Sequence, residues 1–177
     1  MTDREALIAL NMMQGVGPVT VRELVKVLGS AAAIWAASAR ELSSIRGAGS
    51  DIVGKIVAQR GRVDPDREIE RARRLGARIV VWGEPDYPDG LTRLHDPPLA
   101  LYLRGSLAPG DRHGIAVVGS RRATAYGRLM AERLGGDLAE AGICVISGLA
   151  RGIDTAAHRG ALDAKGRSVA VLGGALD

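Results

Sequence analysis

The chain has 177 residues, of which 46% are hydrophobic and 25% charged, as expected for one ordinary globular domain or two small ones. No apolar run approaches the roughly 20 residues of a membrane-spanning helix, and we expect no secretory signal, no membrane partner and a cytoplasmic location. The net charge of +4 is compatible with a nucleic-acid partner without demanding one, and the single cysteine, Cys144, excludes a disulfide framework.

The first part of the chain predicts a small all-α domain over residues 1–63. Apolar residues recur there at helical spacing, and glycines or serines stand between the repeats. The predicted helices cover 4–13, 21–28, 31–37, a stretch capped by Ser38 or Ser43, and 52–60.

Two of the breaks between these helices have the same form, an apolar residue followed by x-Gly-apolar-Gly. They contain Gly15 and Gly17 in the first copy and Gly47 and Gly49 in the second. The pattern resembles a tandem helix-hairpin-helix, or SAM-like, domain, in which such glycines bring backbone close to a phosphate at a helix N-terminus. Tight turns between helices need glycine whatever the function, so DNA contact and packing both stay open for these four residues.

The middle of the chain predicts a charged helix over 64–76 and a strand over 78–82. The prolines between 83 and 110 predict an ordered connector without regular helix. Alternating leucines within this connector predict a short strand over 98–104.

The last part of the chain predicts a β-α-β-α-β unit, because apolar runs that end in glycine alternate with helical patterns. We expect Leu129, Leu134 and Leu138 of its first helix to face the core. The fold class is therefore α/β, a Rossmann-like parallel sheet in a domain over 64–177, preceded by the all-α domain. The predicted elements are strands over 115–118, 143–146 and 168–172, and helices over 124–141 and 154–165.

Each of the three strands ends in a loop of small residues, and right-handed crossovers bring these loops to one edge of the sheet. The loops begin Gly119-Ser120, Ser147-Gly148 and Gly173-Gly174. Glycine allows close backbone approach, and each following helix supplies N–H donors to an anion. The edge is therefore predicted to bind an anion, with three arginines beside it: Arg121, Arg122 and Arg151.

Known nucleotide and catalytic patterns do not fit this edge. The dinucleotide fingerprint and the P-loop are both missing, and we expect no cofactor and no metal. Asp154 and His158 are four residues apart on one helix face, which favours a helix-start cap with a histidine partner over a general acid/base pair. Ser120 and Ser147 lack a histidine that would make either a nucleophile. We expect no catalytic residue and no enzyme activity.

The motifs of this edge resemble the DNA-processing protein A (DprA/Smf) family. They are V-V-G-S-R at 117–121, S-G-L-A-R-G-I-D-T-A-A-H at 147–158 and V-A-V-L-G-G-A-L-D at 169–177. The resemblance implies a Rossmann-like domain that binds single-stranded DNA and loads the RecA recombinase onto it in natural transformation. With two neighbours added from the residues themselves, the implied phosphate contacts are Gly119, Ser120, Arg121, Arg122, Ser147, Gly148, Ala150, Arg151 and Gly152.

In that family the sheet continues beyond the position of Asp177, so we expect this chain to be a fragment or an unusually short form. The resemblance implies a homodimer for the full-length protein. Two other functions stay open: a nucleotide-binding phosphoribohydrolase, whose P-G-G-x-G-T segment is not seen here, and a duplex-binding helix-hairpin-helix module.

Overall fold

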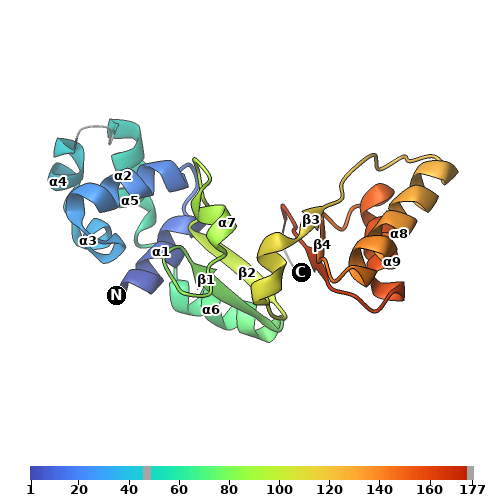
Figure 1. Cartoon of the computed structure of the whole chain (residues 1–177). Helices are drawn as coiled ribbons and strands as arrows, with labels where there is room; N and C mark the ends of the chain where they lie inside the picture. The colour runs from blue at the N-terminus through green and yellow to red at the C-terminus, as the bar shows by residue number, and fades with distance from the viewer. Residues whose placement is uncertain (46–48, 175–177) are drawn as a thin grey trace. The chain divides into compact units, whose positions relative to one another are not determined.

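The computed structural model describes residues 1–45 and 49–174, so Gly47 of the second glycine turn lies outside the described residues. The chain forms two compact units, Met1–Gly105 and Ser106–Asp177. Figure 1 shows the helices and strands of each unit, and each unit is described by itself below.

The first unit begins with five short helices, which confirms the five helical segments predicted from spacing. Their starts are capped: Thr2 and Glu5 form a capping box, and the hydroxyls of Ser30 and Ser38 accept backbone N–H groups of their own helices. Pro18 stands at the first position of its helix, where no N–H is needed. The helices are α1 (Asp3–Met12), α2 (Pro18–Leu28), α3 (Ala31–Ala36), α4 (Ala39–Ser44) and α5 (Ser50–Gln59).

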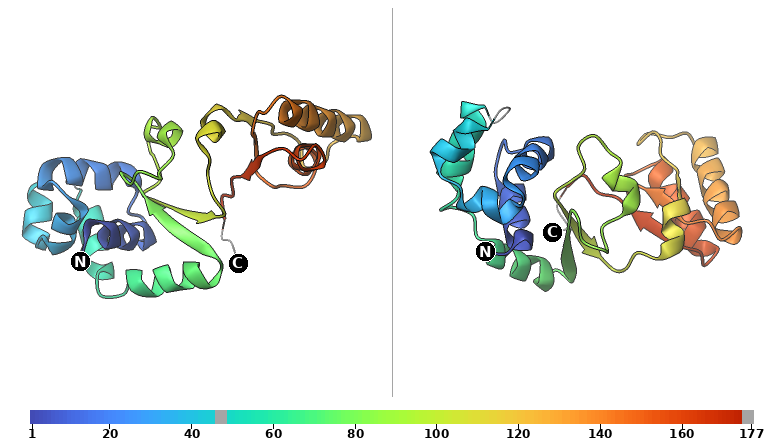
Figure 2. Two further views of the ribbon diagram at one scale, coloured as in Figure 1. Left: turned by 60° about the horizontal axis from the view of Figure 1, so that its bottom comes forward. Right: turned by 60° about the vertical axis from the view of Figure 1, so that its left-hand side comes forward.

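The first unit also includes the segment after residue 63. It contains α6 (Pro65–Arg74), β1 (Ala77–Val81), α7 (Asp89–Thr92) and β2 (Ala100–Arg104). The two strands pair antiparallel, with Ala77 opposite Arg104 and Val81 opposite Ala100, and α6 runs beside β1 (Figure 2).

These later elements share one hydrophobic core with the helices. Ala72 of α6 and Ile79 of β1 lie in the same buried cluster as Leu10 of α1. The compact unit therefore extends to residue 105, because α6, β1 and β2 cover apolar surface of α1. The domain boundary expected at 63/64 stays a prediction about which segments fold independently.

The expectation of no regular helix between 83 and 110 is wrong in two places. The one-turn helix α7 begins directly after Pro88, and a 3-10 turn, η1 (Pro109–His113), begins at Pro109. Proline is tolerated in the first turn of a helix because the N–H that it lacks would have no partner there.

The second unit confirms the predicted β-α-β-α-β order and a Rossmann-like parallel sheet. Its strands lie in the order β3-β4-β5, with Ile115 opposite Val145 and Val145 opposite Ser168. The strands are shorter than predicted, whereas the helices match within two residues. The elements are β3 (Ile115–Ala116), α8 (Ala125–Glu140), β4 (Val145–Ser147), α9 (Ile153–Asp163) and β5 (Ser168–Ala170).

Helices α8 and α9 lie side by side and contact each other through small residues (Figure 1). A Cβ added at Gly135 would lie 2.3 Å from the carbonyl oxygen of Ala157, and one at Gly160 would lie 1.8 Å from that of Glu132. Only glycine permits backbones to approach so closely. The glycine and alanine face of α8 therefore points toward α9.

This packing makes the prediction for two leucines of α8 wrong. Leu129 and Leu134 are 64% and 48% exposed, and only Leu138 packs against the buried cluster of the unit. The reason is geometric, because the face that carries the small residues occupies the contact with α9 and turns the leucine-bearing face outward.

A bidentate ion pair joins η1 to the start of β5. The Arg167 Nε and Nη2 atoms donate to Asp111 Oδ1 and Oδ2 at 2.7 and 2.6 Å, and the backbone N–H of Ala108 donates to Oδ2 at 2.7 Å. Asp111 is buried, and the Arg167 guanidinium lowers the pKa of its carboxyl group from 3.8 to about 2. The ionised form of Asp111 therefore stabilises the second unit.

We expect Asp111→Asn to lower the free energy of unfolding of the second unit by about 2 kcal/mol at pH 7. A carboxyl group with a lowered pKa stabilises the fold above its unfolded pKa, so the wild type should lose this stability as the pH falls from 3.8 to about 2. Both tryptophans, Trp35 and Trp82, lie in the first unit, so hydrogen exchange of the β4 and β5 amides is the suitable measurement. An unchanged acid profile in the Asn variant would contradict the assignment.

Candidate functional site

Three loops follow the parallel strands of the second unit and meet at one edge of the sheet. We call them loop 1 (residues 117–124, after β3), loop 2 (148–152, after β4) and loop 3 (171–174, after β5). The backbone N–H of Val171 donates to the carbonyl oxygen of Ser147 at 2.8 Å, which holds loop 3 beside the start of loop 2. The predicted convergence of the loops is therefore present.

Asp154, in the first turn of α9, binds loops 1 and 2 together. Its Oδ1 accepts the backbone N–H of Gly119 at 3.3 Å, and its Oδ2 accepts that of Gly148 at 3.1 Å. The residue is only 6% exposed. Because one buried carboxylate accepts from both loops, it sets the spacing between them.

Gly152 provides a second junction between the same loops. Its φ is +91°, and a Cβ at this position would lie 2.2 Å from the carbonyl oxygen of Ser120. The same oxygen accepts the backbone N–H of Ile153 at 3.3 Å. Loops 1 and 2 thus touch backbone to backbone, and only glycine fits at this point.

The expected pairing of Asp154 with His158 is not formed. Asp154 uses its oxygens for the two loops, and His158 Nδ1 lies 2.6 Å from the Ser168 hydroxyl. That hydroxyl donates to the carbonyl oxygen of Val145 at 3.0 Å, so the proton in the first contact belongs to the histidine. Both side chains are buried, and His158 Nε2 has no partner among the described residues. Their contacts serve the backbone and the helix–sheet junction.

The arginines predicted for the site are exposed, and no described residue pairs with their side chains. The guanidinium groups of Arg121, Arg122 and Arg151 make no hydrogen bond or ion pair with any described residue. The Ser120 hydroxyl accepts the backbone N–H of Arg122 at 3.1 Å, which shapes loop 1 around these side chains. The loop edge therefore presents positive charge that nothing in the described chain neutralises.

Loop 2 also presents backbone donors. The N–H groups of residues 149–152 donate to no acceptor in the described part of the chain, and they precede α9, whose dipole favours an anion. The N–H of Gly148 is already used by Asp154. We call the N–H groups of residues 149–152 the phosphate cradle of loop 2, and of the predicted contacts it includes Ala150, Arg151 and Gly152.

The prediction for Ser147 needs correction. The residue is 2% exposed, and its hydroxyl donates to the carbonyl oxygen of Val117 at 2.6 Å. A buried hydroxyl that is already used by a neighbouring strand has no access to an exposed phosphate. Ser147 instead ties β4 to the beginning of loop 1.

Sequence reasoning missed two residues that shape loop 2. The Thr155 N–H and hydroxyl both donate to the carbonyl oxygen of Ala150, at 3.0 and 2.6 Å. Leu149 adopts a φ of +56°, which is unusual for a residue with a side chain. Thr155 lies in the first turn of α9, but Gly-x-x-Thr is not a capping-box pattern, so the sequence does not signal its bonds to Ala150. No sequence pattern signals the conformation of Leu149.

The first glycine turn of the other unit packs against α5. The backbone N–H of Gln14 donates to Gln59 Oε1 at 2.9 Å, and Gln59 Nε2 donates back to the Gln14 carbonyl oxygen at 3.1 Å. Gly15 has a φ of +73° and lies against the side chain of Lys55. Gly17 precedes α2 and Gly49 precedes α5, both beside open space. Packing accounts for Gly15, and DNA contact by these turns stays a prediction.

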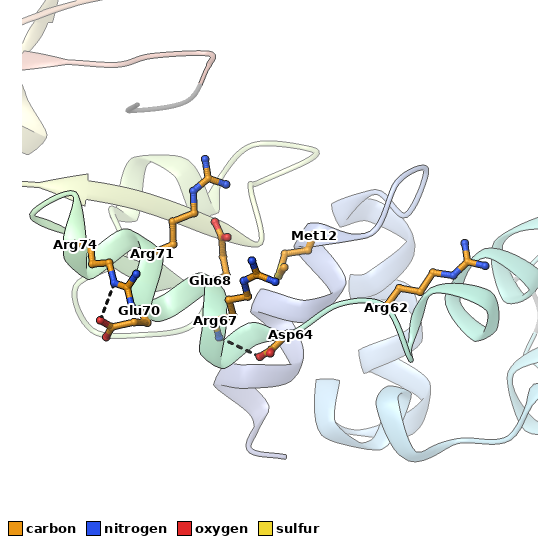
Figure 3. A pocket seen from close by; sticks show the side chains of 8 residues that line it. All are labelled: Met12, Arg62, Asp64, Arg67, Glu68, Glu70, Arg71 and Arg74. Atoms are coloured by element: carbon orange, nitrogen blue, oxygen red, sulfur yellow. Dashed lines mark hydrogen bonds and ion pairs between the residues drawn. The ribbon is translucent and has the colours of Figure 1, made fainter.

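A groove of about 620 Å³ lies along α6 in the first unit (Figure 3). Its carboxylates have partners within the unit: Glu70 pairs with Arg73 and Arg74, and Glu68 accepts the Tyr102 hydroxyl at 2.7 Å. Positive and negative groups thus alternate along this groove, unlike the loop edge. The lining residues are Met12, Arg62, Asp64, Arg67, Glu68, Glu70, Arg71 and Arg74.

Within residues 1–45 and 49–174, no group of three His, Cys, Asp or Glu side chains could hold a metal ion. None of the helices in these ranges is long and apolar enough to cross a membrane.

Comparisons with known proteins agree with the motifs of the loop edge. The family model of DNA recombination-mediator protein A matches residues 78–177. Protein Smf of Synechocystis sp. is 32% identical over 174 residues, which cover 96% of this chain and 44% of that protein. DNA processing protein DprA of Bacillus subtilis is 34% identical over 111 residues, 61% of this chain and 37% of that protein. This chain therefore spans less than half of these two relatives.

The fold is also found in a solved structure. The X-ray structure of DNA processing protein A from Streptococcus pneumoniae superposes with a TM-score of 0.74 at 24% identity. The match covers 98% of this chain and 58% of that one. At this identity the likeness supports the fold alone.

Proposed function

The chain belongs to the DNA recombination-mediator protein A family, and on that premise we propose that its loop edge binds the phosphates of single-stranded DNA. The observation that carries the proposal is a set of three exposed guanidinium groups with no partner among the described residues, on loops that Asp154 and Gly152 hold together. They belong to Arg121, Arg122 and Arg151. We propose single-stranded DNA as the ligand because the motifs of loops 1 and 2 resemble those of this family.

The chemistry of the edge suits a phosphodiester. A guanidinium presents paired N–H donors that match two phosphate oxygens, and the N–H groups of residues 149–152 can donate to a further phosphate oxygen at the start of α9. Contacts of this kind are indifferent to base sequence and weaken as salt rises. We therefore propose that this surface binds single-stranded DNA of any base sequence and does not recognise a particular sequence.

The same resemblance extends the proposal to partners. We propose that the full-length protein presents the bound strand to the RecA recombinase and acts as a homodimer. We also propose a binding module in place of an enzyme, since Asp154 and His158 are buried and their contacts hold backbone and strands in position.

We expect Arg121→Glu to weaken binding of a single-stranded oligonucleotide at least about tenfold, because it removes a charged phosphate contact and adds a repelling carboxylate. Fluorescence anisotropy with labelled oligo-dT over a salt series measures this, and the slope of log affinity against log salt should fall by about one. Arg112→Glu is the matched control, because exposed Arg112 lies in η1, before β3, at the opposite edge of the sheet. It should change affinity much less.

Two outcomes would favour the other functions. Preference for duplex, with no effect of Arg121→Glu, would direct attention to the glycine turns of the first unit as a helix-hairpin-helix module. Nucleotide hydrolysis that is lost in Asp154→Ala at an unchanged affinity for nucleotide would favour a phosphoribohydrolase.

A further inference from the structure

Leu149 adopts a backbone conformation that the fold by itself does not require of a leucine. Its φ is +56°, and among the described residues only Lys165 shares a positive φ without being glycine. A Cβ makes this left-handed conformation unfavourable, whereas glycine adopts it freely. The same loop has glycine at two other positions, Gly148 and Gly152, but leucine at this one.

Hydrogen bonds on both sides hold Leu149 in this conformation. The N–H of Gly148 donates to Asp154 Oδ2 at 3.1 Å, and the carbonyl oxygen of Ala150 accepts two bonds from Thr155. The strain is therefore maintained by the surrounding contacts, as is typical of residues that serve a binding site.

Burial does not account for the leucine. The residue is 56% exposed and belongs to neither buried hydrophobic cluster of the described residues. Glycine at this position would relieve the strain and expose less apolar surface to water. A large apolar side chain here thus works against stability and needs another explanation.

The surroundings indicate what the side chain contacts. The same loop holds the N–H groups of residues 149–152 and the side chain of Arg151, none of which has a partner in the described part of the chain. Further apolar residues, Val118 and Val171, are exposed in loops 1 and 3. A phosphodiester has no apolar surface that Leu149 could contact. The base faces of a single strand are apolar and accessible, whereas the base faces of a duplex are stacked on one another.

We propose that Leu149 is a contact site for an unpaired nucleobase, placed beside the phosphate cradle of loop 2. The inference rests on the proposed binding of single-stranded DNA and adds a physical basis for distinguishing a single strand from a duplex. Arginines and backbone N–H groups bind phosphates of either form, whereas Leu149 gains contact only when a base face is exposed.

The test compares two oligonucleotides of equal length, oligo-dT and an abasic phosphodiester chain, with the 177-residue chain and its Leu149→Gly variant. We expect the variant to lower the ratio of the affinity for oligo-dT to the affinity for the abasic chain about fivefold, since glycine keeps the N–H group of residue 149 and only the base contact is lost. Its thermal stability should equal or exceed that of the wild type, because strain is relieved. Leu149→Met keeps an apolar side chain and should retain the preference for oligo-dT.

Lys165→Gly is the matched control. Lys165 has the same φ of +56° but follows α9, before β5, at the opposite edge of the sheet. The variant should gain similar stability and keep the wild-type ratio of the two affinities. The ratio is insensitive to the lost lysine charge because that charge affects both phosphate chains alike.

Each other result would overturn the inference. An equal loss for both oligonucleotides would show that Leu149 only shapes the phosphate cradle, and a lower melting temperature would show a structural role. Equal affinity of the wild type for both chains would refute the base contact but leave phosphate binding intact. No binding of either chain by the wild type would refute the proposed function together with this inference.

Discussion

Gly152→Ala is expected to reduce binding of single-stranded DNA by at least about a hundredfold, because it separates loops 1 and 2. The new Cβ would lie 2.2 Å from the carbonyl oxygen of Ser120, and the φ of +91° disfavours any side chain. Overpacking and backbone strain together cost about 3 kcal/mol or more. Anisotropy measures the affinity, and circular dichroism shows whether the helices of the second unit persist.

Gly142→Ala provides the matched control for this prediction. Gly142 has a φ of +74° at the end of α8, but a Cβ there would meet no atom of the described residues within 4 Å. The variant should cost about 1 kcal/mol from strain alone and leave binding unchanged. If Gly152→Ala bound DNA as well as Gly142→Ala did, the junction between the loops would have no part in the site.

Asp154→Asn should cost the second unit about 2–3 kcal/mol and weaken DNA binding at least about tenfold. An amide has one acceptor oxygen, so its NH₂ group would face the N–H of Gly119 or Gly148, both of which Asp154 now satisfies. Electrostatics alone would predict the opposite, since removal of a negative charge near phosphates should strengthen binding. Weaker binding would therefore identify a positioning role, and chemical denaturation followed by circular dichroism measures the stability.

Asp163→Asn is the control on the same helix. Asp163 is exposed at the end of α9, where a negative charge opposes the helix dipole, so its loss should be neutral or slightly stabilising. Stronger binding by Asp154→Asn with unchanged stability would contradict the positioning role. It would mean that the carboxylate merely repels phosphate.

The elements of the fold could be predicted because their signals are local. Caps such as Ser38, the proline at residue 18 and the apolar runs before Gly119 and Gly148 act within a few residues of their own position. The meeting of the three loops followed from the parallel orientation of the strands, which places their carboxyl ends at one edge of the sheet. These arguments needed no side-chain contact.

The errors fall where two local patterns compete or where partners are distant in the sequence. Helix α8 carries both a leucine face and a glycine and alanine face, and hydrophobicity favours the first for burial. Close approach to Gly160 of α9 selects the second. Likewise, spacing suggested His158 as the partner of Asp154, whereas its actual partners include Gly119, 35 positions away.

The sequence by itself determined the helical first part, the parallel β-α-β-α-β unit and a loop edge with three arginines. These depend on periodicity, capping and glycine placement, which are properties of short segments. Only the tertiary structure decided that Asp154 joins two loops, that Ser147 is buried and that Leu149 is strained yet exposed. The physical reason is that hydrogen bonds between loops and the allocation of helix faces depend on which backbones come within contact distance.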